Sequence, residues 1–372
     1  MPAKTVSTER IIGFDALRFC MVVFVVMLHS AMTYMEYVPQ WWYVIDEDRS
    51  LFFTQLVVFL DSFPMTVLFF LSGYFAPPSF AKRGRTSFLK DKLIHIGAPW
   101  VLGTALIAPF FAYASYLGYG LPPIPAGEFI WKWFFGAFYQ QSNYWFLGVL
   151  FVCFAVYGQF YAGYTGTNAL ENPSLRVPWR LILILSAVSV SAYYVVACVK
   201  PSDGWINIGY VLYFQPARVA GYIAFFALGA HGWRNRWFTA RGWSPNAAVW
   251  FVAALASSAL LLKWKFTFSN AMRSDVNAIC DAVSYNAASI SMTFFLTGFF
   301  LKFQDMFGRI TVFFTPHVYG IYWLQQVVLM PFLYIIKPYD APAALKFAVS
   351  IPVNVIVCLV LSRYVLKKTP FF

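Results

Sequence analysis

Residues 11–36 read IIGFDALRFCMVVFVVMLHSAMTYME, an apolar stretch that few charges interrupt. An α-helix needs about 20 mostly apolar residues to cross the hydrocarbon core of a bilayer, and this stretch is long enough. Over the whole chain, 60% of residues are hydrophobic and only 11% are charged, whereas soluble domains carry about 25% charged residues. The sequence therefore predicts an all-α, polytopic membrane bundle. Its long unbroken apolar runs exclude a porin-type barrel.

About ten membrane spans can be marked along the chain by their hydrophobicity. Their expected ranges are 11–36, 51–75, 94–117, 143–164, 180–199, 209–231, 246–263, 281–301, 310–336 and 343–365. Sorting the loops alternately places 17 basic residues on one side and 8 on the other. The positive-inside rule then predicts that both termini are cytoplasmic. We expect a cytoplasmic segment at 1–10, a transmembrane domain at 11–366 and a cytoplasmic tail at 367–372.

The net charge of +12 has the same explanation, because basic residues gather in the short loops of membrane proteins. We therefore expect the protein to interact with the lipid bilayer and not with nucleic acid. The five cysteines are scattered in or beside apolar spans without a C-x-x-C pair. This spacing argues against a disulfide framework and against a zinc site, so we expect no metal.

The first span carries the richest set of ionisable residues. Arg18 and His29 are eleven positions apart, about three helical turns, so they share a face with roughly 16 Å between their Cα atoms. Asp15 precedes Arg18 by three residues and can hold its guanidinium. Ionisable groups in a membrane are costly, which makes each a functional candidate. The alternatives are that Arg18 snorkels toward the cytoplasm and that His29 bonds a neighbouring helix.

Asp61 lies well inside the second expected span. It is a candidate countercharge for Arg18, or a carboxylate that orients the imidazole of His29. The simpler alternative is a hydrogen bond between helices. Arg218 and His317 stand near the starts of later spans, where each could line a cavity or mark a membrane boundary.

Five segments resemble, in order, those of the membrane-bound acyltransferase 3 family. The first is FDALR at 14–18 followed by HS at 29–30, and the others are FFLSGYF at 69–75, YWFL at 144–147, FFALGA at 225–230 and YGIYWL at 319–324. Together with DSFPM at 61–65, the second segment is similar to the branch that contains glucan biosynthesis protein C. Gln325 stands where the family often has a histidine, so no role for a second histidine is carried over.

The resemblance implies transfer of an acetyl or succinyl group across the bacterial inner membrane. The donor would be cytoplasmic acetyl-CoA or succinyl-CoA, and the acceptor a hydroxyl of a periplasmic glucan or another cell-envelope polysaccharide. His29 would act as a base or a transient acyl carrier, with Arg18 binding the donor or stabilising charge. The rival hypothesis is a transporter or flippase for a lipid-linked sugar that transfers no acyl group.

The densest basic cluster in the sequence follows the second span. It consists of Lys82, Arg83, Arg85, Lys90 and Lys92. If the resemblance holds, we expect these side chains to bind the phosphates of CoA, because guanidinium groups match phosphate oxygens. The alternatives are a purely topological role and binding of anionic lipids.

Aromatic residues are concentrated in the loops expected outside the cytoplasm. The first of these loops carries Trp41, Trp42 and Tyr43. Amphipathic rings of this kind usually mark the boundary between membrane and water. The alternative is a carbohydrate-stacking surface at the mouth of a site.

Overall fold

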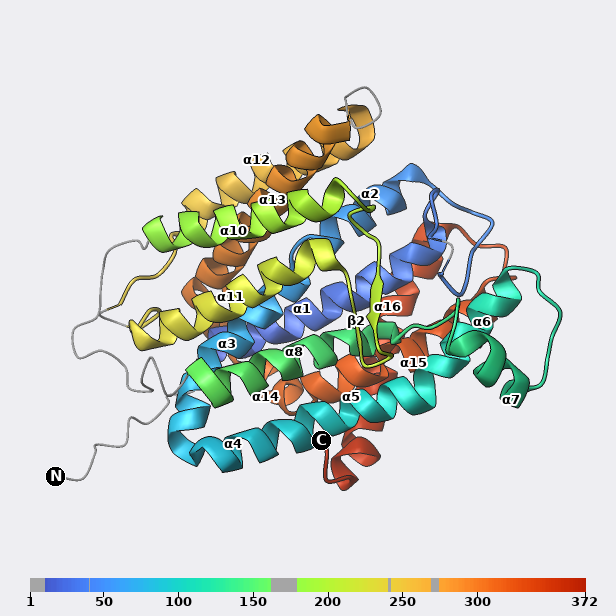
Figure 1. Cartoon of the computed structure of the whole chain (residues 1–372), viewed down its shortest axis with the longest axis horizontal. Coiled ribbons are helices and arrows are strands. Elements are labelled where there is room, and N and C mark those ends of the chain that lie inside the picture. Colours follow the sequence, from blue (N-terminus) through green and yellow to red (C-terminus); the bar gives the residue numbers. More distant parts are fainter. Residues whose placement is uncertain (1–10, 40, 162–178, 240–241, 269–273) are drawn as a thin grey trace.

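The computed structural model describes residues 11–39, 41–161, 179–239, 242–268 and 274–372, which form a helical bundle (Figure 1). The strands β1 (Ile206–Ile208) and β2 (Leu212–Phe214) form a short antiparallel hairpin. The helices are α1 (Ile12–Ala31), α2 (Leu51–Asp61), α3 (Pro64–Arg83), α4 (Arg85–Lys92), α5 (Ala98–Leu102), α6 (Ala108–Gly118), α7 (Ala126–Phe129), α8 (Trp145–Val156), α10 (Trp179–Ala197), α11 (Pro216–Arg234), α12 (Ala247–Lys263), α13 (Ser274–Lys302), α14 (Gln304–Phe314), α15 (Val318–Ile336) and α16 (Ala343–Tyr364).

Eight helical stretches of the described residues are long and apolar enough to cross a membrane. The expected spans at 209–231 and 281–301 correspond to α11 and α13, which are long but carry polar residues such as Arg218 and Asp281. The all-α membrane class is therefore confirmed. The count of about ten spans and the cytoplasmic position of both termini stay predictions. The segment expected at 1–10 lies outside the described residues.

The second expected span, 51–75, lies within Leu51–Arg83, one of the eight stretches that can cross a membrane. Two helices occupy this region, with α2 ending at Asp61 and α3 running from Pro64 to Arg83. Proline lacks a backbone N–H and is favoured in the first turn of a helix, so Pro64 starts a new helix instead of continuing the old one. Pro216 begins α11 in the same way. Both helix starts help to form the cavity described below.

Helix α1 lies at the centre of the bundle and packs against α2, α3, α13, α14, α15 and α16. The helices α3 and α11 approach each other especially closely. A Cβ atom at Gly73 would lie 1.9 Å from the carbonyl oxygen of Phe226, and one at Gly229 would lie 2.0 Å from that of Phe70. Glycine is required at both contacts because any side chain would separate the two helices.

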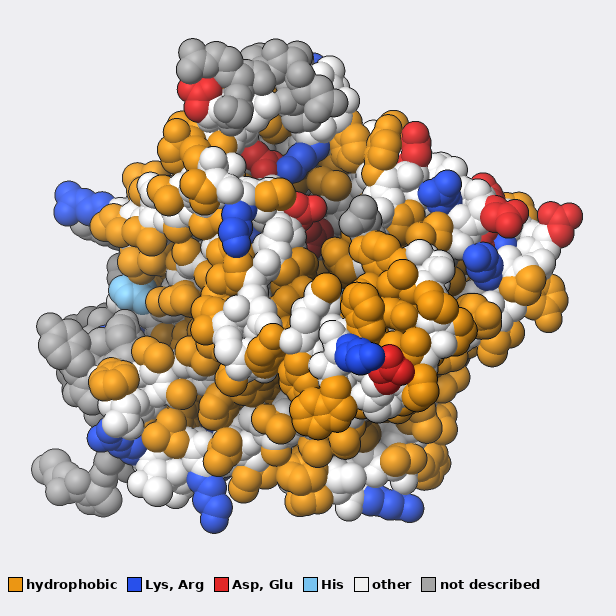
Figure 2. Space-filling model, turned by 45° about the vertical axis from the view of Figure 1, so that its right-hand side comes forward, with side chains coloured by type: hydrophobic (Ala, Val, Ile, Leu, Met, Phe, Trp, Pro, Cys, Tyr) orange, Lys and Arg blue, Asp and Glu red, His pale blue; other side chains and the backbone are white. Residues whose placement is uncertain are grey.

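The outer surface of the bundle is strongly apolar. Hydrophobic side chains cover much of the face shown in Figure 2. Large rings are exposed on the surface of the bundle, with Phe110 exposed by 75% and Trp131 by 81%. A water-soluble monomer rarely exposes so continuous an apolar area, whereas a lipid-facing surface requires one.

Candidate active site

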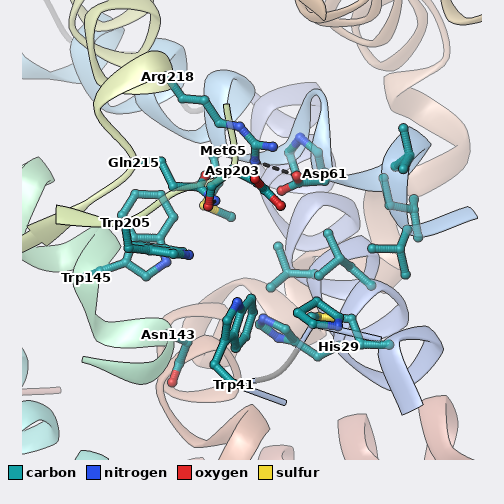
Figure 3. A pocket seen from close by; sticks show the side chains of 18 of the residues that line it. His29, Trp41, Asp61, Met65, Asn143, Trp145, Asp203, Trp205, Gln215 and Arg218 are labelled. Carbon is teal, nitrogen blue, oxygen red and sulfur yellow. Dashed lines mark hydrogen bonds and ion pairs between the residues drawn. The ribbon is translucent and has the colours of Figure 1, made fainter. Parts of the chain in front are cut away.

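A cavity of about 340 Å³ lies where α1 ends and where α3, α8 and α11 begin (Figure 3). Helix α1 contributes His29, and the break between α2 and α3 contributes Asp61. The first turns of α8 and α11 contribute Trp145 and Arg218, and the segment before the hairpin contributes Trp205. The starts of three helices thus surround one space, and each start carries partial positive charge.

His29 is held from two sides at the end of α1. Its Nδ1 atom lies 3.0 Å from Oε1 of Gln325 on α15. Its ring stacks on Trp42, with the ring centroids 5.8 Å apart and an angle of 17° between the planes. The indole N–H of Trp42 donates in turn to the hydroxyl of Thr33. With the amide oxygen facing the imidazole, Nδ1 carries the proton and Nε2 is the basic nitrogen.

Gln325 is the position at which the sequence departs from the family pattern. The side chain is fully buried and its amide oxygen faces His29. Its backbone oxygen accepts a hydrogen bond from the side-chain amide of Asn354 at 2.8 Å. The glutamine therefore fixes the orientation of the imidazole, a role that the sequence analysis did not assign to it.

Asp61 does not pair with Arg18, so that interpretation of the sequence was wrong. Its carboxylate Oδ2 is bound by the guanidinium of Arg218. The ring of Tyr285 lies 4.9 Å from the centre of this guanidinium, and its hydroxyl reaches the backbone oxygen of Asp61. Arg218, and not Arg18, reaches Asp61, because Asp61 ends α2 and Arg218 lies in the first turn of α11 at the same cavity (Figure 3).

Arg18 and Asp15 lie in another part of the molecule. The two form the expected pair, with Arg18 Nη1 3.6 Å from Asp15 Oδ1. The guanidinium also lies over the ring of Phe75, 5.4 Å from its centroid. Neither residue is among the described residues that line the cavity of His29. The structure brings His29 and Asp61 to one cavity and keeps Arg18 and Asp15 at the opposite end of α1.

Aromatic rings form a connected wall of the cavity. The rings of Trp205 and Tyr213 stack in parallel, 4.8 Å apart. Trp41 and Trp145 meet Trp205 edge-on, at centroid distances of 6.4 and 5.4 Å. Trp42 is almost fully buried beside His29. Trp41 and Tyr43 of the first loop line the cavity, a position compatible with the carbohydrate-stacking surface considered above.

The phenols of this wall are neutral near pH 7. Burial raises the pKa of Tyr213 to about 12. Burial also raises the pKa of Tyr43, whose hydroxyl donates to the side-chain oxygen of Gln140. A neutral phenol both donates and accepts hydrogen bonds, so this wall offers polar contacts without negative charge.

Most of the basic cluster at the end of α3 and in α4 is accessible to solvent. Arg83 lies 3.6 Å from the carboxylate of Asp91 and donates to the hydroxyl of Ser79. Arg85 donates to the side-chain oxygen of Gln159 at 3.1 Å. A guanidinium has five N–H donors, so these partners leave both arginines further donors for a ligand. The exposed members of the cluster are Lys82, Arg83, Arg85 and Lys90.

Lys92 differs from the other four basic residues. Its ammonium lies 3.1 Å from Asp91 and close to the rings of Phe88 and Phe154. Its side chain is only 17% exposed. These contacts stabilise the packing of α4 against α8, so Lys92 is poorly placed for the phosphate contact that the sequence suggested.

The fold and the cavity define a polytopic helical membrane protein whose central helix presents an oriented imidazole to a polar, aromatic-lined space. A family model described as an acyltransferase domain, Acyl_transf_3, matches residues 11–363. The chain belongs to this family and is a multi-pass membrane acyltransferase. The resemblance noted in the sequence is thus confirmed.

Named relatives point to the same branch of the family. Glucans biosynthesis protein C of Escherichia coli O1:K1 / APEC is 24% identical over 323 residues, which cover 83% of this chain and 79% of that protein. The protein of the same name from Salmonella typhi is 22% identical over 326 residues, covering 83% of this chain and 80% of its own. The similarity therefore extends over most of both chains.

Proposed function

We propose that this acyltransferase moves an acetyl or succinyl group from an acyl-CoA to a hydroxyl of a carbohydrate outside the bacterial inner membrane. The donor is acetyl-CoA or succinyl-CoA from the cytoplasm. The acceptor is a periplasmic glucan or another cell-envelope polysaccharide. The names of the bacterial relatives support a glucan as acceptor.

The observation that carries the proposal is the setting of His29. Its Nδ1 is occupied by Gln325, and its ring lines a cavity large enough for part of a substrate. A sugar hydroxyl is a poor nucleophile at neutral pH, and a positioned imidazole is the usual base for it. His29 therefore has the chemistry and the geometry of a general base.

The reaction balances without a further reactant. The acceptor oxygen attacks the thioester carbonyl while Nε2 of His29 takes the hydroxyl proton. The C–S bond then breaks, an ester forms, and the departing CoA thiolate receives the proton from the imidazolium. Transfer through a transient acyl group on His29 would use the same nitrogen in two steps.

The donor end of the reaction lies at the other end of α1. CoA carries several phosphate charges, and the accessible guanidinium groups of Arg83 and Arg85 suit them. Arg18 lies over the ring of Phe75 on α3, the helix that ends in this cluster, and we assign it to donor binding as well. The long pantetheine arm of CoA separates its phosphates from its thioester. The phosphates can therefore bind at the basic cluster while the thioester reaches His29.

The test is product formation by the purified full chain in nanodiscs. Labelled acetyl-CoA and succinyl-CoA are supplied separately with a neutral glucan, and labelled ester on the glucan is measured. We expect ester from the wild type and none from His29→Asn. The matched control is His95→Asn, because His95 is exposed and bonds only within its own helical region.

Each outcome separates the competing functions. Ester formed with one donor identifies the acyl group that is transferred. Equal ester formation by the wild type and His29→Asn would remove His29 from the mechanism. Sugar translocation that needs no acyl-CoA, together with a lack of ester, would favour the transporter or flippase.

A further inference from the structure

The two cationic side chains that line the cavity are each paired with a carboxylate. Among the described lining residues, Arg218 and Lys265 are the basic ones besides His29, and Asp61 and Asp203 are the acidic ones. Arg218 is bound to Asp61, and Lys265 lies 2.6 Å from the carboxylate of Asp281. Both cations are therefore neutralised by the chain itself. A phosphorylated or acidic ligand finds no uncommitted positive charge here, so the cavity favours an uncharged one.

Asp61 is the member of its pair that faces the space. Its side chain is 38% exposed, whereas that of Arg218 is 8% exposed. Arg218 binds Oδ2 from behind, and Tyr285 supports both the guanidinium and the backbone of Asp61. The second carboxylate oxygen, Oδ1, is thereby held toward the cavity. An oriented carboxylate is a strong acceptor for hydroxyl groups of a ligand.

The aromatic wall supplies the complementary apolar contact. Tyr213 covers one face of Trp205, and the edges of Trp41 and Trp145 fix the indole from two directions. Rigid indoles offer large contact areas at little entropic cost. The C–H face of a pyranose ring packs on such surfaces, while its hydroxyls bond to acids and amides around them. The cavity combines both features.

Ring contacts connect this wall to the imidazole. Trp41 meets Trp42 at a centroid distance of 5.9 Å, and Trp42 stacks on His29. A sugar against Trp205 and Trp41 therefore occupies the cavity that His29 also lines (Figure 3). Asp61 and the imidazole line the same cavity and are available to its hydroxyls.

We infer that Trp205, Trp41 and Asp61 form the acceptor subsite and that it takes an uncharged pyranose unit. Trp205 stacks on the ring, Trp41 borders it at a steep angle to Trp205, and Asp61 accepts hydrogen bonds from its hydroxyls while Arg218 holds the carboxylate in place. The word acceptor rests on the proposed function, because only that function says which reaction follows sugar binding. The binding step itself needs no donor.

The experiment measures sugar binding without acyl-CoA. The full chain in nanodiscs is titrated with a neutral tetrasaccharide of glucose, and binding is followed by saturation-transfer NMR and calorimetry. The acidic probe is a tetrasaccharide of galacturonic acid. We expect the neutral probe to bind at least about tenfold more tightly, which corresponds to 1.4 kcal/mol.

Variants assign the contacts. Trp205→Ala weakens binding of the neutral probe about tenfold or more, and Trp205→Phe retains most of it because a ring remains. Asp61→Asn weakens binding several-fold. The matched controls are Trp131→Ala and Asp340→Asn, both exposed and outside the cavity, and they bind as the wild type does.

Three results overturn the subsite. They are absence of binding to the wild type, equal binding of neutral and acidic probes, and equal behaviour of Trp205→Ala and Trp131→Ala. Failure of the proposed function looks different, because the neutral probe would then bind through Trp205 while no ester forms from either acyl-CoA. Ester formation with unchanged binding in Trp205→Ala would leave the function standing and remove the subsite.

Discussion

The two ends of α1 each carry polar residues, but their surroundings differ. Arg18 is 36% exposed and pairs with Asp15 one turn away on the same helix. His29 is held by Gln325, 296 positions distant in the chain, and it faces a cavity. The proposed function assigns a different task to each end, with charge for the donor at the Arg18 end and proton transfer at the His29 end. The following predictions test that division.

The largest effect is expected at the cavity end. We predict that His29→Ala lowers kcat by about 10²- to 10⁴-fold, the usual contribution of a general base. Binding of the neutral tetrasaccharide changes little, because stacking and carboxylate contacts remain. Steady-state kinetics and calorimetry on the same preparation check both parts, with His95→Ala as the control. Unchanged kcat would end the assignment of the imidazole.

The next effect is expected at the opposite end of α1. Arg18→Gln raises the KM for acyl-CoA by roughly ten- to hundredfold, the range for a lost hydrogen bond to a charged group, and leaves kcat within a few-fold. Arg18→Lys restores part of the loss, since an ammonium keeps the charge but not the planar fork. The split between KM and kcat is the measurement. A fall in kcat at constant KM would show that Arg18 acts on the reacting atoms and that the two ends are not separate.

Gln325 gives a smaller effect at the cavity end. Gln325→Leu keeps the volume but removes the acceptor for Nδ1 of His29, so the imidazole loses its fixed tautomer. We expect kcat to fall roughly tenfold, about 1.4 kcal/mol in the barrier, with sugar binding unchanged. Gln325→Glu keeps an acceptor oxygen and recovers most of the rate. Equal losses in both variants would mean that Gln325 contributes only packing.

The difference between the two ends also explains what sequence could predict. The Asp15–Arg18 pair was foreseen because i,i+3 neighbours on a helix always face each other. Membrane class followed from composition, and His29 from its spacing to Arg18 within the family-like motif. The partners of His29 and Asp61 lie 296 and 157 positions away. Which helix faces meet depends on packing, as at Gly73, and one sequence does not determine it.

The helix break at Pro64 shows the same limit at shorter range. The hydropathy of 51–75 predicts one membrane span, and the proline within it indicates a helix start. The break matters because it makes Asp61 the last residue of α2, where its side chain lines the cavity beside Arg218. A local signal was present, but its consequence depended on a helix more than 150 residues later in the chain.

The smallest effect is expected from the basic cluster. Arg83→Gln combined with Arg85→Gln removes two exposed charges, each worth at most about 1 kcal/mol in water. We therefore predict a rise of about fivefold in the KM for acyl-CoA that shrinks as salt is added, because exposed charges are screened. Lys132→Gln is the control, since Lys132 is also exposed and forms a comparable surface pair with Glu128.

The affinity for the tetrasaccharide must stay constant in both variants. If the affinities for tetrasaccharide and donor fall together, the cluster supports the structure of the whole bundle instead of binding the donor. If neither changes, its role is topological, and Arg18 alone defines the donor end of α1.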